Sequence, residues 1–409
     1  MKPQRNTPAL ARAGAWPRGG RAVAVIACVA MLAGCSTIKG WFGGDGEKAA
    51  AKRAAEPAEL VEFTPSASAS RLWSASAGKG EDQLGVRQGP VVADGRVYAA
   101  AVDGGVRAFD LQSGASVWHY DSDLRLSGGP GAGDGLVVVG SLDGEVVALD
   151  AATGAERWTA GVSNEVIAAP VVGQGLVFVR SNDGRLTAFD AQDGARRWFW
   201  NRDLPTLTVR GNDAPVLGPG LVFVGSDDGT VAALSIADGR PLWEQAVGLP
   251  EGRTELDRMA DVDGTPVLDG TTLFATSYKR STLAIDAPSG RPLWSSDRGG
   301  SGRLGLSPNL VVAADPDGTV WGIDKASGTA LWQQAALARR NPGSAAVQGD
   351  YAVVGDFDGY LHWMRLDNGE FAARERAGRA PLRGPLMVAD GILVVQNTEG
   401  DLSAWRVSP

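Results

Sequence analysis

The chain has 409 residues, of which 44% are hydrophobic and 21% are charged, and its formal net charge is −8. This globular balance is long enough for two average domains or for one large fold built from repeats. The acidic balance argues against nucleic acid as a partner, because a phosphate backbone attracts basic surfaces. With 56 glycines and 13 tryptophans, the composition favours an all-β architecture of repeated units.

Residues 1–34 are predicted to be a lipoprotein signal peptide. The first five charged residues are all basic, and the apolar run AVAVIACVAMLAG follows them. This run is too short to be a comfortable membrane span. It ends in LAGC, Leu32 to Cys35, which resembles the lipobox of bacterial lipoproteins. The resemblance implies cleavage before Cys35 and acylation of that cysteine. The alternative is an ordinary secretory signal that happens to contain a cysteine.

Cleavage at this point would remove five positive charges and no negative ones, so the formal charge becomes −8 − 5 = −13. Acyl chains contribute about 0.8 kcal/mol per buried CH₂, and no other segment reaches ~18 apolar residues. We therefore predict attachment through the N-terminal lipid only. The resemblance to lipoprotein signals also implies the periplasmic face of the outer membrane, because Ser36 stands where an Asp would mark inner-membrane retention.

The mature chain is predicted to begin with a tether and to lack cysteine chemistry. Residues 35–70 comprise the lipidated Cys35 and a flexible spacer rich in Gly, Ala, Ser and charge. The only other cysteine, Cys28, lies inside the signal. The folded part, predicted over residues 71–409, therefore has no cysteine for a disulfide, a metal site or a nucleophile.

A repeated unit fills the rest of the chain. Three copies read DGGVRAFDLQSGASVW, DGEVVALDAATGAERW and DGRLTAFDAQDGARRW. Each unit, with its upstream half, contains four short apolar runs separated by Gly turns, which is the pattern of one four-stranded antiparallel propeller blade. A spacing near 40 residues is also typical of propeller blades. The eight units begin at Asp103, Asp143, Asp183, Asp228, Lys279, Asp317, Asp358 and Glu399.

The count predicts an eight-bladed β-propeller closed by an N-terminal strand. The last unit ends before its fourth strand, and SRLWSAS, which contains Trp73, supplies a matching strand just after the tether. Pairing these ends would remove two exposed sheet edges. The repeated tryptophans are predicted to pack between neighbouring blades rather than to form a cofactor site, since equivalent places cannot all belong to one site. They are Trp118, Trp158, Trp198, Trp243, Trp294 and Trp332.

Chemical motifs are sparse, and we predict no catalysis, no cofactor and no metal. The chain has two histidines, His119 and His362, and no HExxH spacing. The segments DVDG and DPDG lack the later Glu of an EF-hand loop. The repeat resembles that of the quinoprotein dehydrogenases, which carry calcium and quinone ligands, but no equivalent clamp is evident here. A quinone-dependent or other small-molecule enzyme is the alternative, because fold alone does not decide function.

Together, the lipobox, the tether and the eight-fold repeat resemble the BamB family of the outer-membrane β-barrel assembly machine. The resemblance implies a non-catalytic scaffold that binds the periplasmic modules of the central barrel protein, BamA, together with other subunits of the machine. It also suggests contact with unfolded outer-membrane proteins, for which outer strand edges are one candidate surface. A lipid-anchored propeller serving another envelope complex stays open as a third interpretation.

Two gaps exceed the regular repeat spacing, and they contain LPTLTVRGNDAP, residues 204–215, and RTELDRMADVDGTP, residues 253–266. The resemblance implies that these two connections dock the partner. Matched residue by residue, the implied contacts are Leu207, Val209, Arg210, Asp261 and Asp263. Met259 occupies the apolar slot before the aspartates. The alternative is an internal network of the loop arginines and acids without any partner, although function tends to lie in loops held by a rigid scaffold.

Overall fold

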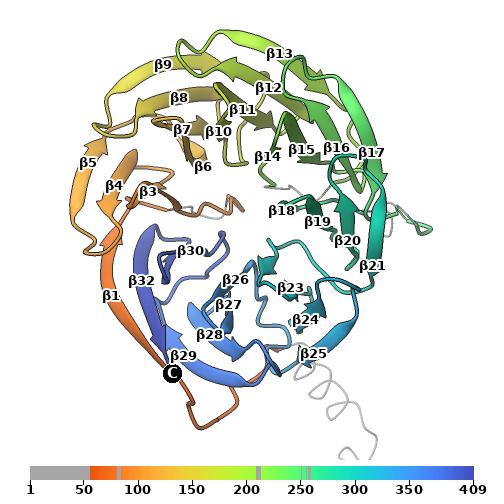
Figure 1. Ribbon diagram of the computed structural model, residues 1–409. Helices are drawn as coiled ribbons and strands as arrows, with labels where there is room; N and C mark the ends of the chain where they lie inside the picture. The colour runs from red at the N-terminus through yellow and green to blue at the C-terminus, as the bar shows by residue number, and fades with distance from the viewer. Residues whose placement is uncertain (1–55, 81–83, 209–212, 250, 255, 257–258) are drawn as a thin grey trace, which may run out of the picture. The chain divides into compact units, whose positions relative to one another are not determined.

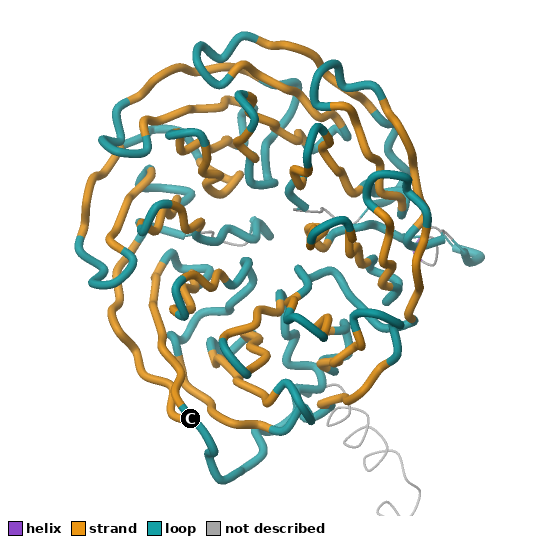
Figure 2. The backbone as a smooth tube through the Cα atoms, viewed as in Figure 1, coloured by secondary structure: helices purple, strands orange, loops and turns teal. Residues whose placement is uncertain are grey.

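The described part of the chain contains 32 strands, which form eight four-stranded antiparallel sheets. The computed structural model describes residues 56–80, 84–208, 213–249, 251–254, 256 and 259–409. Within the unit from Pro57 to Pro409, the sheets stand as blades around one axis (Figure 1). Mostly short loops join the strands (Figure 2). The predicted eight-bladed propeller is confirmed.

Strands follow one another from the axis outward in each blade. The first four blades are β2 (Val91–Ala93), β3 (Arg96–Ala100), β4 (Val106–Asp110), β5 (Ser116–Tyr120); β6 (Leu126–Gly133), β7 (Leu136–Ser141), β8 (Glu145–Asp150), β9 (Glu156–Gly161); β10 (Val171–Gly173), β11 (Leu176–Ser181), β12 (Arg185–Asp190), β13 (Arg196–Asn201); and β14 (Val216–Gly218), β15 (Leu221–Gly225), β16 (Thr230–Ser235), β17 (Pro241–Ala246).

The second half of the chain repeats this order and brings in the N-terminal strand. The remaining blades are β18 (Gly264–Asp269), β19 (Thr272–Thr276), β20 (Thr282–Asp286), β21 (Pro292–Ser296); β22 (Gly305–Leu306), β23 (Leu310–Ala314), β24 (Val320–Asp324), β25 (Ala330–Gln334); β26 (Ala345–Gln348), β27 (Tyr351–Gly355), β28 (Tyr360–Arg365), β29 (Phe371–Arg376); and β30 (Met387–Ala389), β31 (Ile392–Gln396), β32 (Asp401–Ser408) with β1 (Ser68–Ser76).

The repeated Asp and Gly residues form the turn before each outer strand. In the second blade, Asp150 Oδ1 accepts hydrogen bonds from the amide and the hydroxyl of Thr153, both at 2.9 Å. Hydrogen bonds from Arg157 and Thr153 lower the pKa of Asp150 to about 2. Gly154 follows with a φ of +75°, and a Cβ there would lie 2.6 Å from the Trp118 ring. Glycine therefore serves both the turn and the packing between blades.

Tryptophans join each blade to the next, as predicted. In seven outer strands the indole Nε1 donates to a main-chain carbonyl of the following blade over 2.8 to 3.0 Å. Each ring thereby buries apolar area and satisfies its one polar group. β29 has no tryptophan, and the tilted ring pair Trp363 and Trp405 fills the boundary between the seventh and eighth blades instead.

The ring closes through β1, which confirms the predicted role of Trp73. β1 pairs antiparallel with β32 from Ser68↔Ser408 to Ser76↔Asp401. Trp73 is 8% exposed, and its Nε1 donates to the carbonyl of Leu111 in the first blade. A strand from the start of the chain thus completes the last blade and covers the edge of β32.

The compact unit spans Pro57–Pro409 and so includes a segment that precedes β1, while the boundary at residue 71 stays a prediction. Arg374 donates to the carbonyl of Val61 over 2.9 Å, and Phe63 stacks on Phe371 with ring centroids 5.5 Å apart. These contacts attach the segment before β1 to the seventh blade. Composition does not reveal them, because Arg374 and Phe371 lie far from this segment in the sequence. In the part of the chain that the structure describes, no helix is long and apolar enough to cross a membrane.

Candidate functional site

Two long connections depart from the compact loops of the other blades. One joins β13 to β14 and the other joins β17 to β18. Their described residues include four large apolar side chains that are exposed, a composition that favours contact with a partner. These are Leu204 and Leu207, each 42% exposed, Leu249, 58% exposed, and Leu256, 65% exposed.

The predicted contact residues fall into two environments. Leu207 is exposed, whereas Asp261 and Asp263 are 0% and 4% exposed. Val209 and Arg210 lie outside the described residues. Met259, the apolar residue that precedes the aspartates, is also buried. The second connection thus directs Asp261 and Asp263 inward, while the first leaves Leu207 on the surface.

Beneath these connections, four buried carboxylates gather around one arginine. One oxygen from each of Asp227, Asp261 and Asp263 lies within 4.8 Å of the others. Arg180, on β11, donates from Nη2 to Asp227 Oδ1 over 2.7 Å and forms a second ion pair with Asp213. We call Asp213, Asp227, Asp261 and Asp263 the carboxylate cluster. Burying several charges is costly unless partners compensate them, so this grouping marks a specialised place in the fold.

Backbone contacts hold the cluster in position. The amide of Val262 donates to the carbonyl of Ser226 over 3.2 Å, and the Asp261 carbonyl accepts from Tyr278 over 2.8 Å. Gly225 provides room, since a Cβ there would lie 2.5 Å from Asp213 Oδ2. The carboxylates therefore come from three consecutive segments, two of which are the long connections, and strand ends of the third, fourth and fifth blades anchor them.

Asp263 is the most strongly perturbed of these acids. Burial raises its pKa to about 7, and the negative charges of Asp261 and Asp227 add to the rise, while Arg87 and Arg180 oppose it. Neither of its carboxylate oxygens has a hydrogen-bond partner among the described residues. The side chain thus holds a proton near neutral pH at the centre of a negatively charged cluster.

Carboxylates at this spacing can bind a hard cation or accept hydrogen bonds from a guanidinium group. The sequence alone favours neither, because DVDG lacks the remaining ligands of a known calcium loop. What the structure adds is Asp227, which the turn between β15 and β16 contributes. The arrangement offers charge and preorganised oxygens, which suit recognition by a cationic side chain.

The raised pKa predicts that Asp263→Asn stabilises the protein. The folded chain keeps the Asp263 proton over a pH range in which the unfolded chain, with an ordinary pKa of 3.8, has released it. The stability that this proton confers is therefore lost as pH rises toward 7. Asn keeps the shape without the charge, so we expect the free energy of unfolding to rise by about 4 kcal/mol at about pH 8.

Urea unfolding across the pH range would measure this effect. The advantage of Asn should vanish near pH 4, grow toward pH 7 and stay constant above it, to within about one pH unit. Asp121→Asn is the matched control, because Asp121 has a side chain that is 92% exposed. Equal stability of Asp263→Asn and the parent protein at about pH 8 would contradict the assignment.

The sequence analysis missed two residues of the carboxylate cluster, Asp213 and Asp227, and the arginine that pairs with both, Arg180. Asp227 looks like an ordinary turn residue, and Asp213 sits in a loop segment. Arg180 does leave a signal, because the equivalent positions in other blades hold small residues such as Ala100, Gly140 and Gly225. The eighth blade has the neutral Gln396 at this position, so Arg180 is the one charged residue there and indicates a local partner of opposite charge.

Comparison with known proteins identifies the family. The profile of the outer membrane protein assembly factor BamB family matches residues 53–125, 102–334 and 306–408. The chain belongs to the BamB family. A BamB from Xanthomonas campestris pv. campestris is 61% identical over 397 residues, which cover 94% of this chain and 97% of that protein.

Solved structures agree on the fold. The crystal structure of BamB from Moraxella catarrhalis aligns with a TM-score of 0.75 and 27% identity, covering 83% of this chain and all of that one. A quinohemoprotein alcohol dehydrogenase from Pseudomonas putida aligns with a TM-score of 0.64 at 16% identity, covering 83% of this chain and 76% of that one. The second likeness shows a shared propeller and nothing about activity.

Proposed function

We propose that this BamB-family chain is a non-catalytic scaffold of outer-membrane protein assembly, anchored at the periplasmic face of the outer membrane by acyl chains on Cys35. The propeller binds the periplasmic modules of BamA, the central barrel protein, and works with the other subunits of the assembly machine to assist insertion of barrel proteins. Membership of a family of outer membrane assembly factors supports the general role.

One observation carries the docking proposal. The two connections that depart from the repeat carry exposed leucines and contribute Asp213, Asp261 and Asp263 to the buried carboxylate cluster. Leu204, Arg180 and Asp227 line the same small cavity, so the apolar surface and the charges adjoin. Exposed apolar side chains favour burial against a partner, and a preorganised charged centre lowers the cost of ordering side chains on binding.

In this proposal Leu207, Val209 and Arg210 contact the partner. Asp261 and Asp263 act from beneath, since their burial leaves them little surface of their own. A buried carboxylate can order a neighbouring cationic side chain before binding, which lowers the entropy cost of association. The docking site is then a rigid feature of the propeller, and binding should require no large change in shape.

Capture from detergent-solubilised outer membranes tests the proposal. The parent chain should capture the barrel protein, and Arg210→Ala or Asp263→Ala should reduce the captured amount at least about tenfold. The proposal assigns Arg210 to the contact with the partner and Asp263 to the buried cluster that supports it. Arg240→Ala and Asp238→Ala are matched controls, since both residues are exposed in the turn between β16 and β17. Thermal unfolding establishes that each variant is folded.

Each outcome has a distinct meaning. Equal capture by all variants would remove the docking role from these residues while leaving the scaffold role intact. Failure to capture the barrel protein with the parent chain would overturn the docking proposal altogether. Calorimetry with a quinone and calcium would then decide whether the propeller is a small-molecule enzyme, as its fold relatives are.

A further inference from the structure

A cavity of about 330 Å³ lies where the inner ends of the blades meet. Each of the eight blades contributes one equivalent residue to it. In the first blade this residue is Gly89, two positions before Val91, which pairs with Tyr98 of the next strand. We call these residues the axial ring. Its members are Gly89, Gly129, Ala169, Ala214, Thr265, Arg303, Ser344 and Pro385.

Arg303 is the exception in the axial ring. The other seven members are small or are proline, as expected where eight strands converge. Seven blades have a small residue or a proline at this position, and the sixth blade has an arginine. The other seven blades pack around the axis with an uncharged residue at this position, so ring closure does not require a charge there. The departure indicates a purpose other than packing.

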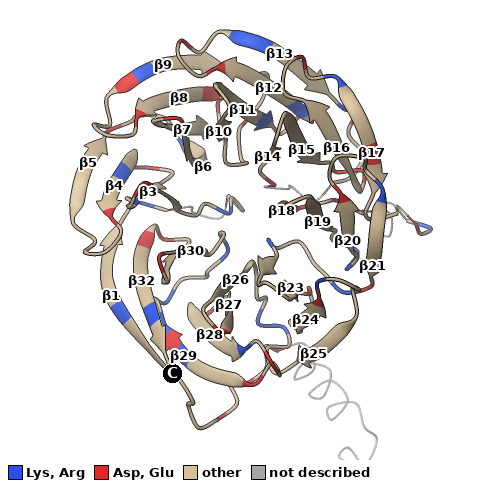
Figure 3. Ribbon diagram, in the orientation of Figure 1, with Lys and Arg blue, Asp and Glu red and all other residues tan. Residues whose placement is uncertain are grey.

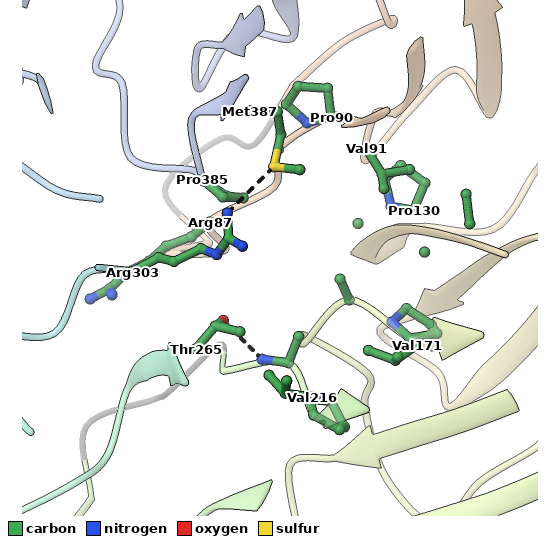
Figure 4. Close-up of a pocket in the computed structure, with 18 of the residues that line it drawn as sticks. Arg87, Pro90, Val91, Pro130, Val171, Val216, Thr265, Arg303, Pro385 and Met387 are labelled. Carbon is green, nitrogen blue, oxygen red and sulfur yellow. Dashed lines mark hydrogen bonds between the residues drawn. The ribbon is translucent and has the colours of Figure 1, made fainter. Parts of the chain in front are cut away.

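The Arg303 guanidinium has no carboxylate partner among the described residues. Its Nη1 contacts the Met387 sulfur at 4.0 Å (Figure 4). Removal from water lowers the pKa of Arg303, and no neighbouring acid offsets this effect. A cation without a counterion, facing a cavity, is suited to an anion supplied from outside.

The charged side chains that line the cavity are all basic. Its lining includes two further arginines, Arg87 and Arg383, and no Asp or Glu. Arg87 donates to the carbonyl of Ser301 over 2.8 Å. Figure 3 shows basic segments on the connections near the middle of the ring, although the whole chain has a net charge of −8. The axis is therefore a local basic region inside an acidic protein.

The opposite wall is apolar. Val91, Pro130, Val171 and Val216 lie across the cavity from Arg303 (Figure 4). Pockets with a mostly apolar lining and a few fixed polar groups are typical of small-molecule sites, and this volume is near the lower end of their range, about 300–1,000 Å³. The cavity thus matches a molecule with one anionic end and a compact apolar body.

We propose that the axial cavity binds a small carboxylate ligand, whose carboxylate accepts hydrogen bonds from Arg303 while its apolar body packs against the proline and valine wall. A planar guanidinium can hold a carboxylate through two parallel hydrogen bonds, which a lysine cannot reproduce. This site adjoins the carboxylate cluster, because Arg87 lines the cavity and also opposes the raised pKa of Asp263. The proposed ligand contact is with Arg303 and does not depend on the docking role.

Calorimetry on the full-length chain in non-ionic detergent tests the inference, with 1-naphthoate as the probe and neutral 1-naphthamide as its isostere. Naphthoate should bind at least about tenfold more tightly than the amide, and the difference should shrink with added salt. Arg303→Gln should remove this difference, while Arg291→Gln, at an exposed turn, should leave it unchanged. A detergent blank accounts for partition into micelles.

Two further variants keep the test decisive. Ala169→Leu should weaken both ligands by filling the axial ring, and Arg303→Lys should retain part of the preference for the acid. Capture of the barrel protein should be unaffected by Arg303→Gln. Absence of naphthoate binding up to about 5 mM, or binding that Arg303→Gln does not reduce, would overturn the proposal. So would equal binding of the acid and the amide.

Discussion

Arg180→Met is expected to lower the free energy of unfolding by about 3–5 kcal/mol at about pH 8, the usual cost of removing one partner from a buried ion pair. Arg180 is 8% exposed and is the cation that pairs with both Asp213 and Asp227. Met fills a similar volume without the charge. The loss therefore reports the uncompensated carboxylates rather than a cavity.

The pH dependence separates charge from packing. Asp263, whose pKa is raised to about 7, is neutral in mildly acidic solution, so the cluster carries less negative charge there. The deficit of Arg180→Met should therefore shrink as pH falls from about 8 to about 5. A loss caused by poor packing would not change with pH.

Urea unfolding measures the effect, and Arg157→Met is the matched control. Arg157 pairs with Asp150 over 2.7 Å, but its side chain is 58% exposed. Exposed pairs of this kind contribute about 0–1 kcal/mol, so the control should lose little stability. If Arg180→Met cost no more than Arg157→Met, the cluster would not depend on Arg180 for its charge balance.

A chain that begins at Ala77 is expected to lose more than about 5 kcal/mol of stability, because it lacks the strand that closes the ring. Truncation removes the β1–β32 ladder and the buried indole of Trp73. It also uncovers Trp405, which is 2% exposed in the closed ring. An open β32 edge should in addition promote aggregation.

Thermal unfolding of two truncations tests this closure. A chain that begins at Pro57 retains β1 and the contacts of Val61 and Phe63 with the seventh blade, so its Tm should match that of the full chain. A peptide of residues 57–77 added to the shorter chain should restore part of the lost stability. An unchanged Tm for the chain from Ala77 would show that β1 is dispensable.

Much of the fold could be predicted because its signals are local. The Asp-Gly turns, the alternating apolar runs and the tryptophans recur at a nearly constant spacing, and each unit specifies its own blade. The incomplete last unit and the unmatched Trp73 predicted the closing strand. Composition did not show that the segment from Pro57 contacts the seventh blade, since its partners there, Arg374 and Phe371, lie far away in the sequence.

The candidate site could be predicted only in outline. The two long connections are visible as breaks in the repeat, and the family resemblance pointed to Leu207, Asp261 and Asp263. The sequence did not show that the two aspartates are buried, nor that Asp213 and Asp227 join them. Those facts depend on which blades are neighbours and on how far each connection turns toward the axis.

The sequence by itself determined the architecture, the number of blades and the family, because period, turn chemistry and apolar alternation are written within each unit. Only the tertiary structure decided the charge placement. Arg180 meets Asp213 and Asp227 across a blade boundary, and Arg303 faces seven small or proline residues around the axis. Such encounters join residues far apart in the chain, and the closure of the ring sets them rather than any local pattern.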